Sequence, residues 1–123
     1  MAKKRILVVD DEIELVKAIR LRLEHAGYEV LLAYNGREGF EKAEKEKPNL
    51  ILMDVLMPEM DGLQAVEKLK TNNQTEAIPV LMLTAKSQLT DVTKATNLGA
   101  EDYIVKPFDS KVLLEKVKKA LRT

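Results

Sequence analysis

The sequence predicts an α/β fold in which a doubly wound, five-stranded parallel sheet is covered by helices on both faces. Five short apolar runs rich in branched residues recur along the 123 residues. The runs are nearly continuous in hydrophobicity, which is typical of strands buried on both faces. Amphipathic segments separate them, so strands and helices alternate with right-handed crossovers in one domain, residues 1–123.

The first strand is the apolar run at residues 6–9, and the helix after it carries a single apolar stripe. Leu15, Ile19 and Leu23 form that stripe at helical spacing. Gly27 follows the stripe, where a left-handed C-cap is expected.

The second strand covers residues 30–32, and the third covers residues 50–53. Residues 36–47 between them are predicted to form the most polar helix, because only Phe40 and Ala43 can supply its buried face. Asn35 precedes this helix as its N-cap.

The second half of the chain repeats this alternation. The fourth strand covers residues 80–83, after a polar loop at residues 71–76, and the fifth covers residues 103–105. Gly99 is the expected C-cap of the fourth helix and Asp109 the N-cap of the fifth. The three apolar stripes here are Leu63, Val66 and Leu69, then Leu89, Val92 and Ala95, then Leu113, Val117 and Leu121.

Composition excludes several classes of protein. Twenty basic residues balance twenty acidic ones, so no global field draws the chain to nucleic acid or to an anionic membrane. The chain has no cysteine, which excludes disulfides and suits a reducing compartment. The first apolar run is too short for a signal peptide or a membrane span, so we expect a cytoplasmic protein.

Polar side chains follow four of the five strands, at the edge where ligands bind in such sheets. They are Asp10 and Asp11 after the first strand, Asp54 after the third, Thr84 after the fourth and Lys106 after the fifth. The second strand ends without a comparable residue, which places it at an edge of the sheet. We therefore expect strand order 2-1-3-4-5, a flavodoxin-like three-layer sandwich, with the carboxylates brought together.

Three neighbouring carboxylates stay ionised only if a cation offsets their repulsion. Hard oxygen ligands without nearby His or Cys favour Mg²⁺, with Mn²⁺ as the alternative. Lys106 and Thr84 are suited to the oxygens of a phosphoryl group, which leaves Asp54 as the nucleophile that forms an acyl phosphate.

Each of these residues also has an ordinary explanation. An isolated Asp beside a helix, such as Asp61, is usually a cap or turn residue. Lys106 alone would be a surface lysine, Thr84 a strand-end hydroxyl and Tyr103 a core residue. The combination at the ends of four strands is what predicts a phosphoacceptor site.

Four segments of the chain resemble the receiver domains of bacterial two-component response regulators, and the likeness runs from Lys4 to Leu121. The segments are Ile-Leu-Val-Val-Asp-Asp-Glu at residues 6–12, Asp-Val-Leu-Met-Pro-Glu-Met-Asp-Gly at 54–62, Leu-Thr-Ala at 83–85, and Gly-Ala-Glu-Asp-Tyr-Ile-Val-Lys-Pro-Phe at 99–108. Receivers catalyse their own phosphorylation and slow hydrolysis, and they are not usually counted as enzymes.

The resemblance implies that Asp54 takes phosphate from a sensor histidine kinase or a histidine phosphotransfer protein. It implies that Asp11, Asp54 and the backbone carbonyl of Leu56 bind Mg²⁺, with Asp10 acting mainly through water. It also implies phosphoryl contacts from Thr84 and Lys106, and a cis peptide bond between Lys106 and Pro107.

The resemblance further implies a switch, in which phosphorylation draws Thr84 inward and lets Tyr103 turn in behind it. The surface made by the fourth helix, the fifth strand and the fifth helix then changes its affinity for a partner protein. We expect this output surface to include Tyr103 and the basic side of residues 111–119. A monomer, or a weak dimer formed on phosphorylation, is expected.

Two positions bear on the lifetime of the acyl phosphate. In the family, the side chains two residues after the aspartate and two after the threonine flank the path of the hydrolytic water, and here they are Leu56 and Lys86. Leu56 cannot orient water through a hydrogen bond, so we expect a fairly long-lived acyl phosphate.

Several alternatives stay open. The chain is either a stand-alone receiver, which its start at Met1 favours, or a receiver cut from a longer DNA-binding regulator. An Asp-nucleophile phosphatase would need an Asp-x-Asp motif after the first strand, and a flavin-binding module would need a phosphate loop there. His25, the only histidine, is expected to be a solvated surface residue and not a phosphate relay.

Overall fold

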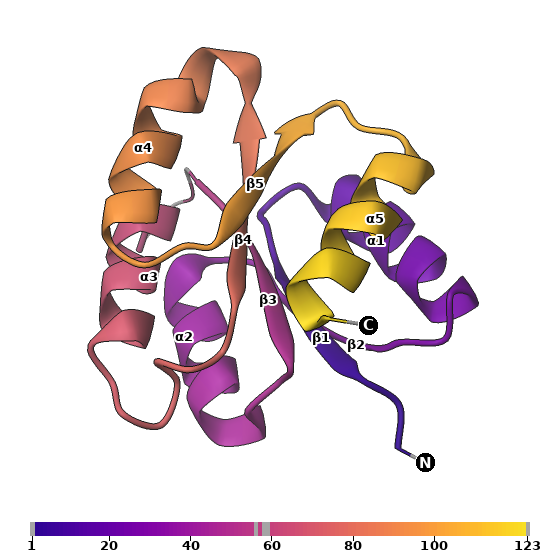
Figure 1. The fold of residues 1–123 in the computed structure, drawn as a ribbon, viewed down its shortest axis with the longest axis horizontal. Coiled ribbons are helices and arrows are strands. Elements are labelled where there is room, and N and C mark those ends of the chain that lie inside the picture. Colours follow the sequence, from indigo (N-terminus) through magenta and orange to yellow (C-terminus); the bar gives the residue numbers. More distant parts are fainter. Residues whose placement is uncertain (1, 56, 58–59, 123) are drawn as a thin grey trace.

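The computed structural model describes residues 2–55, 57 and 60–122, in which strands and helices alternate around one parallel sheet (Figure 1). The strands are β1 Arg5–Val9, β2 Glu29–Ala33, β3 Leu50–Asp54, β4 Val80–Ala85 and β5 Asp102–Lys106. The helices are α1 Ile13–His25, α2 Gly36–Glu46, α3 Gly62–Lys70, the 3-10 turn η1 Lys86–Gln88, α4 Leu89–Asn97 and α5 Ser110–Leu121.

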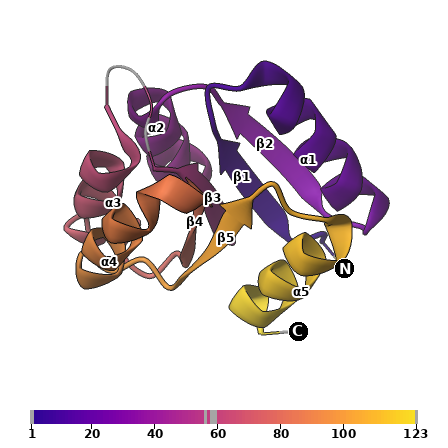
Figure 2. The same ribbon diagram turned by 90° about the horizontal axis from the view of Figure 1, so that it is seen from above.

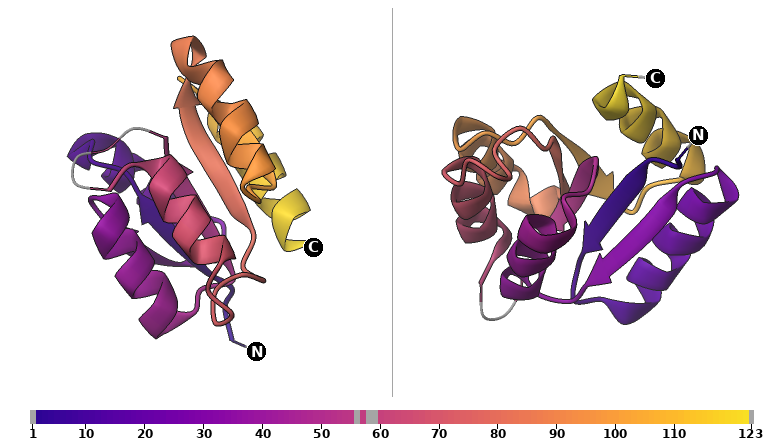
Figure 3. Two further views of the ribbon diagram at one scale, coloured as in Figure 1. Left: turned by 90° about the vertical axis from the view of Figure 1, so that its left-hand side faces the viewer. Right: turned by 90° about the horizontal axis from the view of Figure 1, so that it is seen from below.

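The strand order is β2-β1-β3-β4-β5, which confirms the predicted topology and places β2 at an edge. All four pairings are parallel, and the register sets Val9 beside Met53, Asp54 beside Leu83, and Ala85 beside Lys106. The carboxyl ends of the strands therefore form one edge. Both chain termini lie toward the opposite edge (Figures 1 and 3).

Helices cover both faces of the sheet, with α1 and α5 on one face and α2, α3 and α4 on the other (Figure 2). Alternate strand residues divide between two apolar cores, as the pleat of a strand requires. Leu7, Ile51 and Met82 pack toward the α2, α3 and α4 side. Their neighbours Val8, Leu52 and Leu81 pack toward α1 and α5. The three inner strands are therefore buried on both faces as predicted, whereas the edge strands β2 and β5 are partly exposed.

Helix ends follow the predicted signals. The side chains of Asn35 and Asp109 accept hydrogen bonds from the backbone at the starts of α2 and α5. Asp61 does the same for α3, and its own backbone N–H donates to Oε1 of Gln64 at 3.1 Å, which completes a capping box. Gly27 and Gly99 have φ values of 100° and 119°, the left-handed region that favours glycine. Asn35, Asp61 and Asp109 thus mark where three loops at the carboxyl edge end, whereas Gly27 and Gly99 lie in loops at the opposite edge.

One predicted stripe is partly wrong. Leu89 was expected on the buried face of the fourth helix, but it is 42% exposed. The chain leaves β4 through the 3-10 turn Lys86–Gln88, which the hydrophobic pattern does not reveal, and Leu89 is only the first residue of α4. The buried face of this helix consists of Val92 and Ala95.

Of the helices in the described part of the chain, none has the length and hydropathy that crossing a membrane requires.

Candidate functional site

The carboxyl edge of the sheet brings residues from four strands into one region. Asp54 and Lys106 are the last residues of β3 and β5, and Thr84 is the next-to-last residue of β4. Asp10 directly follows β1, where its backbone N–H still donates to the carbonyl of Ala33 at 3.2 Å. The parallel ladder thus determines where these side chains start.

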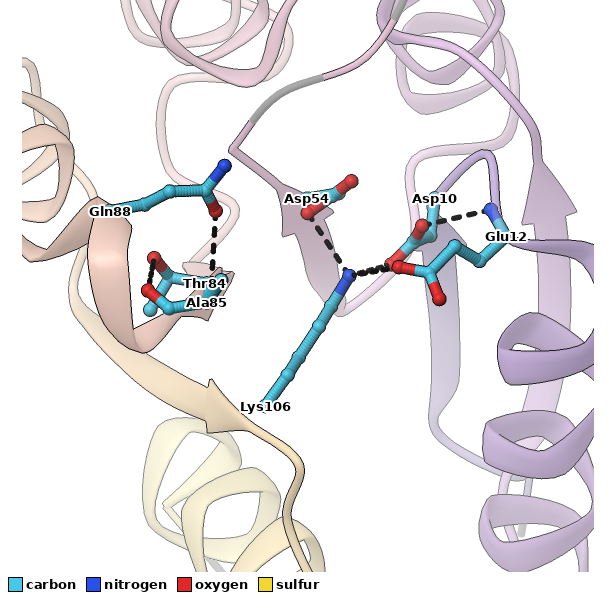
Figure 4. Close-up of polar contacts among 7 residues, drawn as sticks. All are labelled: Asp10, Glu12, Asp54, Thr84, Ala85, Gln88 and Lys106. Atoms are coloured by element: carbon cyan, nitrogen blue, oxygen red, sulfur yellow. Dashed lines mark hydrogen bonds and ion pairs between the residues drawn. The ribbon is translucent and has the colours of Figure 1, made fainter.

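Lys106 joins the acidic residues of this edge (Figure 4). Its Nζ lies 2.8 Å from Asp10 Oδ2 and 3.2 Å from Asp54 Oδ1. A third carboxylate, Glu12 Oε1, lies 3.2 Å from the same nitrogen. The Lys106 side chain is only 16% exposed, so its charge acts where water screens it weakly.

Asp10 and Asp54 are buried, with relative exposures of 0% and 5%. Burial, and then the neighbouring carboxylate of Asp10, raises the pKa of Asp54 to about 7. Burial also raises the pKa of Asp10, against the opposing hydrogen bonds from Lys106 and from the Glu12 backbone N–H. The site therefore favours additional positive charge.

The pKa of Lys106 is also raised, which for a lysine favours the charged form. Burial by itself lowers this pKa, but the hydrogen bond to Asp10 and the charges of Asp10 and Asp54 raise it on balance. Lys106 thus stays protonated and keeps a fixed positive charge beside Asp54.

The acidic cluster has the geometry of a cation site. One carboxylate oxygen each from Asp10, Asp11 and Asp54 lies within 4.8 Å of the others, and Asp11 is exposed to solvent. Hard oxygen donors of this kind fit a divalent cation such as Mg²⁺, whose shell water and phosphate oxygens can complete.

The end of β4 carries two hydrogen-bond donors that are satisfied locally. The Thr84 hydroxyl, which is fully buried, donates to the carbonyl of Ala85 at 3.0 Å. The Ala85 backbone N–H donates to Oε1 of Gln88 at 3.0 Å. Thr84 lies on β4, between the strands that carry Asp54 and Lys106, but its hydroxyl bonds to the adjacent backbone and not to the acidic cluster (Figure 4).

Tyr103 lies on β5, with 38% of its surface exposed. The Nζ of Lys116, on α5, is 5.4 Å from the centre of the Tyr103 ring. The same nitrogen forms an ion pair of 3.0 Å with Asp102. This arrangement holds the ring on the outer surface between β5 and α5.

The structure brings part of the predicted set of side chains together. Asp10, Asp11, Asp54 and Lys106 converge, and the peptide bond between Lys106 and Pro107 is cis as expected. Leu56, predicted to bind the metal through its carbonyl and to affect hydrolysis, lies outside the described residues.

Two contacting residues of the site were not assigned roles from the sequence. Glu12 follows Asp10 and Asp11 in the sequence, but the sequence does not indicate that its side chain contacts Lys106. Gln88 is the last residue of the unpredicted 3-10 turn, so no periodicity could place its amide beside β4.

This arrangement suits transfer of a phosphoryl group to a carboxylate. Asp54 could supply a nucleophilic oxygen, and Lys106 could supply a positive charge for the oxygens around phosphorus. The acidic cluster supplies ligands for a divalent cation beside the same carboxylate. The sequence contains no cysteine, so a thiolate nucleophile is excluded.

Comparison with known proteins agrees with this geometry. A family model for the response regulator receiver domain matches residues 6–118. Chemotaxis protein CheY4 of Vibrio cholerae superposes with a TM-score of 0.90 at 34% identity, covering 97% of this chain and 99% of CheY4. The match favours the receiver hypothesis over the phosphatase and flavin-binding alternatives.

Two curated relatives differ in how much of them the chain covers. The alkaline phosphatase synthesis transcriptional regulatory protein PhoP of Bacillus subtilis is 44% identical over 119 residues, which are 97% of this chain and 49% of PhoP. Protein PilH of Pseudomonas aeruginosa is 41% identical over 117 residues, 95% of this chain and 97% of PilH. The chain thus spans about half the length of PhoP and of other transcriptional regulators that it matches.

Proposed function

The chain belongs to the response regulator receiver domain family, and we propose that Asp54 is the residue that accepts the phosphoryl group. The proposal rests above all on one observation: Lys106 Nζ lies 3.2 Å from a buried carboxylate that is the last residue of the central strand β3. Residues 1–123 would act as one receiver domain in a two-component system.

In the proposed reaction, an oxygen of Asp54 bonds to phosphorus while the bond from phosphorus to the donor nitrogen breaks. The donor is a phosphohistidine on a sensor histidine kinase or a histidine phosphotransfer protein, and its imidazole nitrogen leaves with the electron pair. Lys106 remains protonated and neutralises negative charge on the phosphoryl oxygens. The product is an acyl phosphate.

Asp10, Asp11 and Asp54 would hold a divalent cation, Mg²⁺ or Mn²⁺, which supplies further positive charge to the phosphoryl oxygens. Asp54 would then be fully ionised at neutral pH, because a nearby cation lowers the pKa that burial raises. The domain would catalyse its own phosphorylation and slow hydrolysis, without acting as an enzyme on an outside substrate.

The signal would leave through a change at Thr84 and Tyr103. In the described structure the Thr84 hydroxyl bonds to Ala85 and the Tyr103 ring lies outward beside Lys116. We propose that phosphorylation draws the hydroxyl toward the phosphoryl group, and that Tyr103 turns into the space it leaves. This change would remodel the output surface, formed by α4, β5 and α5.

The output surface would bind a downstream protein in the cytoplasm. Lys111, Lys116 and Lys119 give its α5 side a positive charge, and Leu89 and Val112 are exposed apolar side chains on the same helices. In a longer regulator such as the PhoP-like relatives, this partner would be the rest of the same protein. In a stand-alone receiver it would be a separate chain, or a second copy in a weak dimer.

Beryllium fluoride, a mimic of the phosphoryl group, tests the proposal when added with Mg²⁺ to ¹⁵N-labelled protein. We expect amide shifts to change around Asp54 and also at Tyr103 and along α4, with no change in Asp54→Ala. Changes limited to the neighbourhood of Asp54 would contradict the proposed switch. An Asp54→Ala protein that responds like the parent would contradict the assignment of the site.

A further inference from the structure

The backbone N–H of Ala85 points toward the end of β3. The carbonyl of Leu83 accepts from the Val55 N–H at 3.1 Å, so the backbone of β4 faces β3 at this residue. Backbone groups alternate in direction along a strand, and Ala85, two residues later, faces β3 as well. The Ala85 N–H therefore lies beside the strand that ends in Asp54.

The parallel ladder cannot supply a partner for this N–H. The next acceptor along β3 would be the carbonyl of Val55, but that carbonyl accepts from the Gly62 N–H at 2.8 Å, because the chain turns there into α3. The amide oxygen of Gln88 accepts from the Ala85 N–H instead, at 3.0 Å (Figure 4). Gln88 thus completes the end of the ladder with a side chain.

A phosphoryl group on Asp54 would lie close to the same N–H. Lys106 is the last residue of β5, and its Nζ reaches Asp54 at the end of β3 and Asp10 directly after β1. Because β4 lies between β5 and β3, the Lys106 side chain passes over the end of β4. Phosphoryl oxygens held by Asp54 and Lys106 therefore lie above the end of β4. A backbone N–H at this place is a good donor to an anionic oxygen.

We propose that the Ala85 N–H donates to the Gln88 amide oxygen in the resting protein, and that a phosphoryl oxygen replaces Gln88 as the acceptor on activation. Gln88 is a positioning residue in this proposal, which rests on the proposed phosphorylation of Asp54. Its hydrogen bond competes with the phosphoryl group and raises the threshold for switching. Release of Gln88 also frees the start of η1 and α4, which joins the site to the output surface.

A purely structural role for Gln88 predicts the opposite sign. If Gln88 only stabilises the 3-10 turn, removing its oxygen loosens the loop and weakens binding of a phosphoryl mimic. If Gln88 competes, removing the oxygen strengthens binding, because an intramolecular hydrogen bond no longer has to break. One such bond corresponds to a change of roughly three- to tenfold in affinity.

The test compares the affinity for beryllium fluoride, at saturating Mg²⁺, of the parent, Gln88→Met, Gln88→Glu and Ser87→Ala. Gln88→Met keeps the length of the side chain without its acceptor, and we expect about three- to tenfold tighter binding. Gln88→Glu keeps an acceptor and should bind more weakly than the parent. Ser87→Ala alters the same exposed turn and should match the parent.

The amide resonance of Ala85 supplies a second readout. The chemical shift of this amide should differ between the parent and Gln88→Met before the mimic is added. At saturation the two shifts should coincide, because in both proteins the Ala85 N–H then donates to the mimic. Equal or weaker binding by Gln88→Met overturns the role of Gln88, while Asp54-dependent binding by the parent leaves the proposed function standing. A parent that binds no mimic overturns both.

Discussion

The surroundings of Asp54 disfavour the ionised form of its carboxyl group. The carboxyl is 5% exposed, and burial and the nearby Asp10 carboxylate raise its pKa to about 7, although Lys106 lies 3.2 Å away. Such a group is costly to keep charged in the absence of a further cation. The same property prepares it to bind a divalent ion and to accept a phosphoryl group.

The raised pKa of Asp54 gives a pH dependence of stability. Between about pH 4 and pH 7 the metal-free folded protein retains a proton that the unfolded chain, with a carboxyl pKa of 3.8, has released. The contribution of Asp54 to stability therefore falls as the pH rises through this range, and its full cost is present above pH 7.

The substitution Asp54→Asn removes that cost. At pH 8 in EDTA we expect its melting temperature to exceed that of the parent by several degrees, or about 1–2 kcal/mol, with a smaller gain at pH 5. Mg²⁺ should stabilise the parent and have little effect on the variant. Thermal unfolding measures both effects.

Asp61→Asn is the matched control for this experiment. It removes one negative charge near the same edge and keeps the oxygen that caps α3. It should show neither the pH-dependent gain nor the loss of the Mg²⁺ effect. An equal gain for Asp54→Asn at pH 5 and pH 8 would argue against a raised pKa at this position.

The start of α3 is fixed by a close approach to β3. A Cβ atom at Gly62 would lie 2.1 Å from the carbonyl oxygen of Asp54 and 2.9 Å from Val55 Cα. The N–H of Gly62 donates to the Val55 carbonyl at 2.8 Å. Only glycine fits at this close approach between α3 and the end of β3.

We therefore expect Gly62→Ala to move the backbone at Asp54. The overlap should cost about 1–3 kcal/mol in unfolding free energy and weaken Mg²⁺ binding, which a calorimetric titration measures. Gly27→Ala is the control: its φ of 100° makes it strained as well, but no atom lies within 4 Å of the added Cβ and the site is distant. If both variants bind Mg²⁺ like the parent, Gly62 has no positioning role.

Elements with a local signal were predictable from the sequence. The strands are continuous apolar runs. Asn35 and Asp109 mark helix starts through side chains that cap the neighbouring backbone, and Gly27 and Gly99 follow helix ends because glycine tolerates positive φ. The strand order followed from which strands end in charged residues, and it placed Asp10, Asp11, Asp54 and Lys106 together.

Other features depend on contacts that no local pattern carries. The 3-10 turn at Lys86–Gln88 has no periodicity of its own, so the exposure of Leu89 and the bond from Ala85 to Gln88 were missed. The ion pair between Glu12 and Lys106 joins residues 94 positions apart. The contact of Tyr103 with Lys116 joins two different elements, β5 and α5.

At the level of the molecule, the parallel sheet links the site to the output surface. β4 and β5 are paired, with Thr84 beside Val105 and Met82 beside Tyr103. In the proposed switch, a displacement of Thr84 toward Asp54 would open space next to the strand that carries Tyr103, and α4 follows β4 through η1. The pairing of β4 with β5 would then carry the change from the phosphoryl group to the exposed surface.

Phosphotransfer to Asp54 can be measured with ³²P-labelled donors. The parent, Asp54→Ala and Asp61→Asn would be incubated with Mg²⁺ and either phosphorylated sensor kinases or phosphoramidate, a small donor with a phosphorus–nitrogen bond. We predict that the parent and Asp61→Asn take up label, that EDTA prevents uptake, and that Asp54→Ala takes up none. Label on Asp54→Ala, or a parent that no donor labels, would contradict the assignment of Asp54 as the phosphoacceptor.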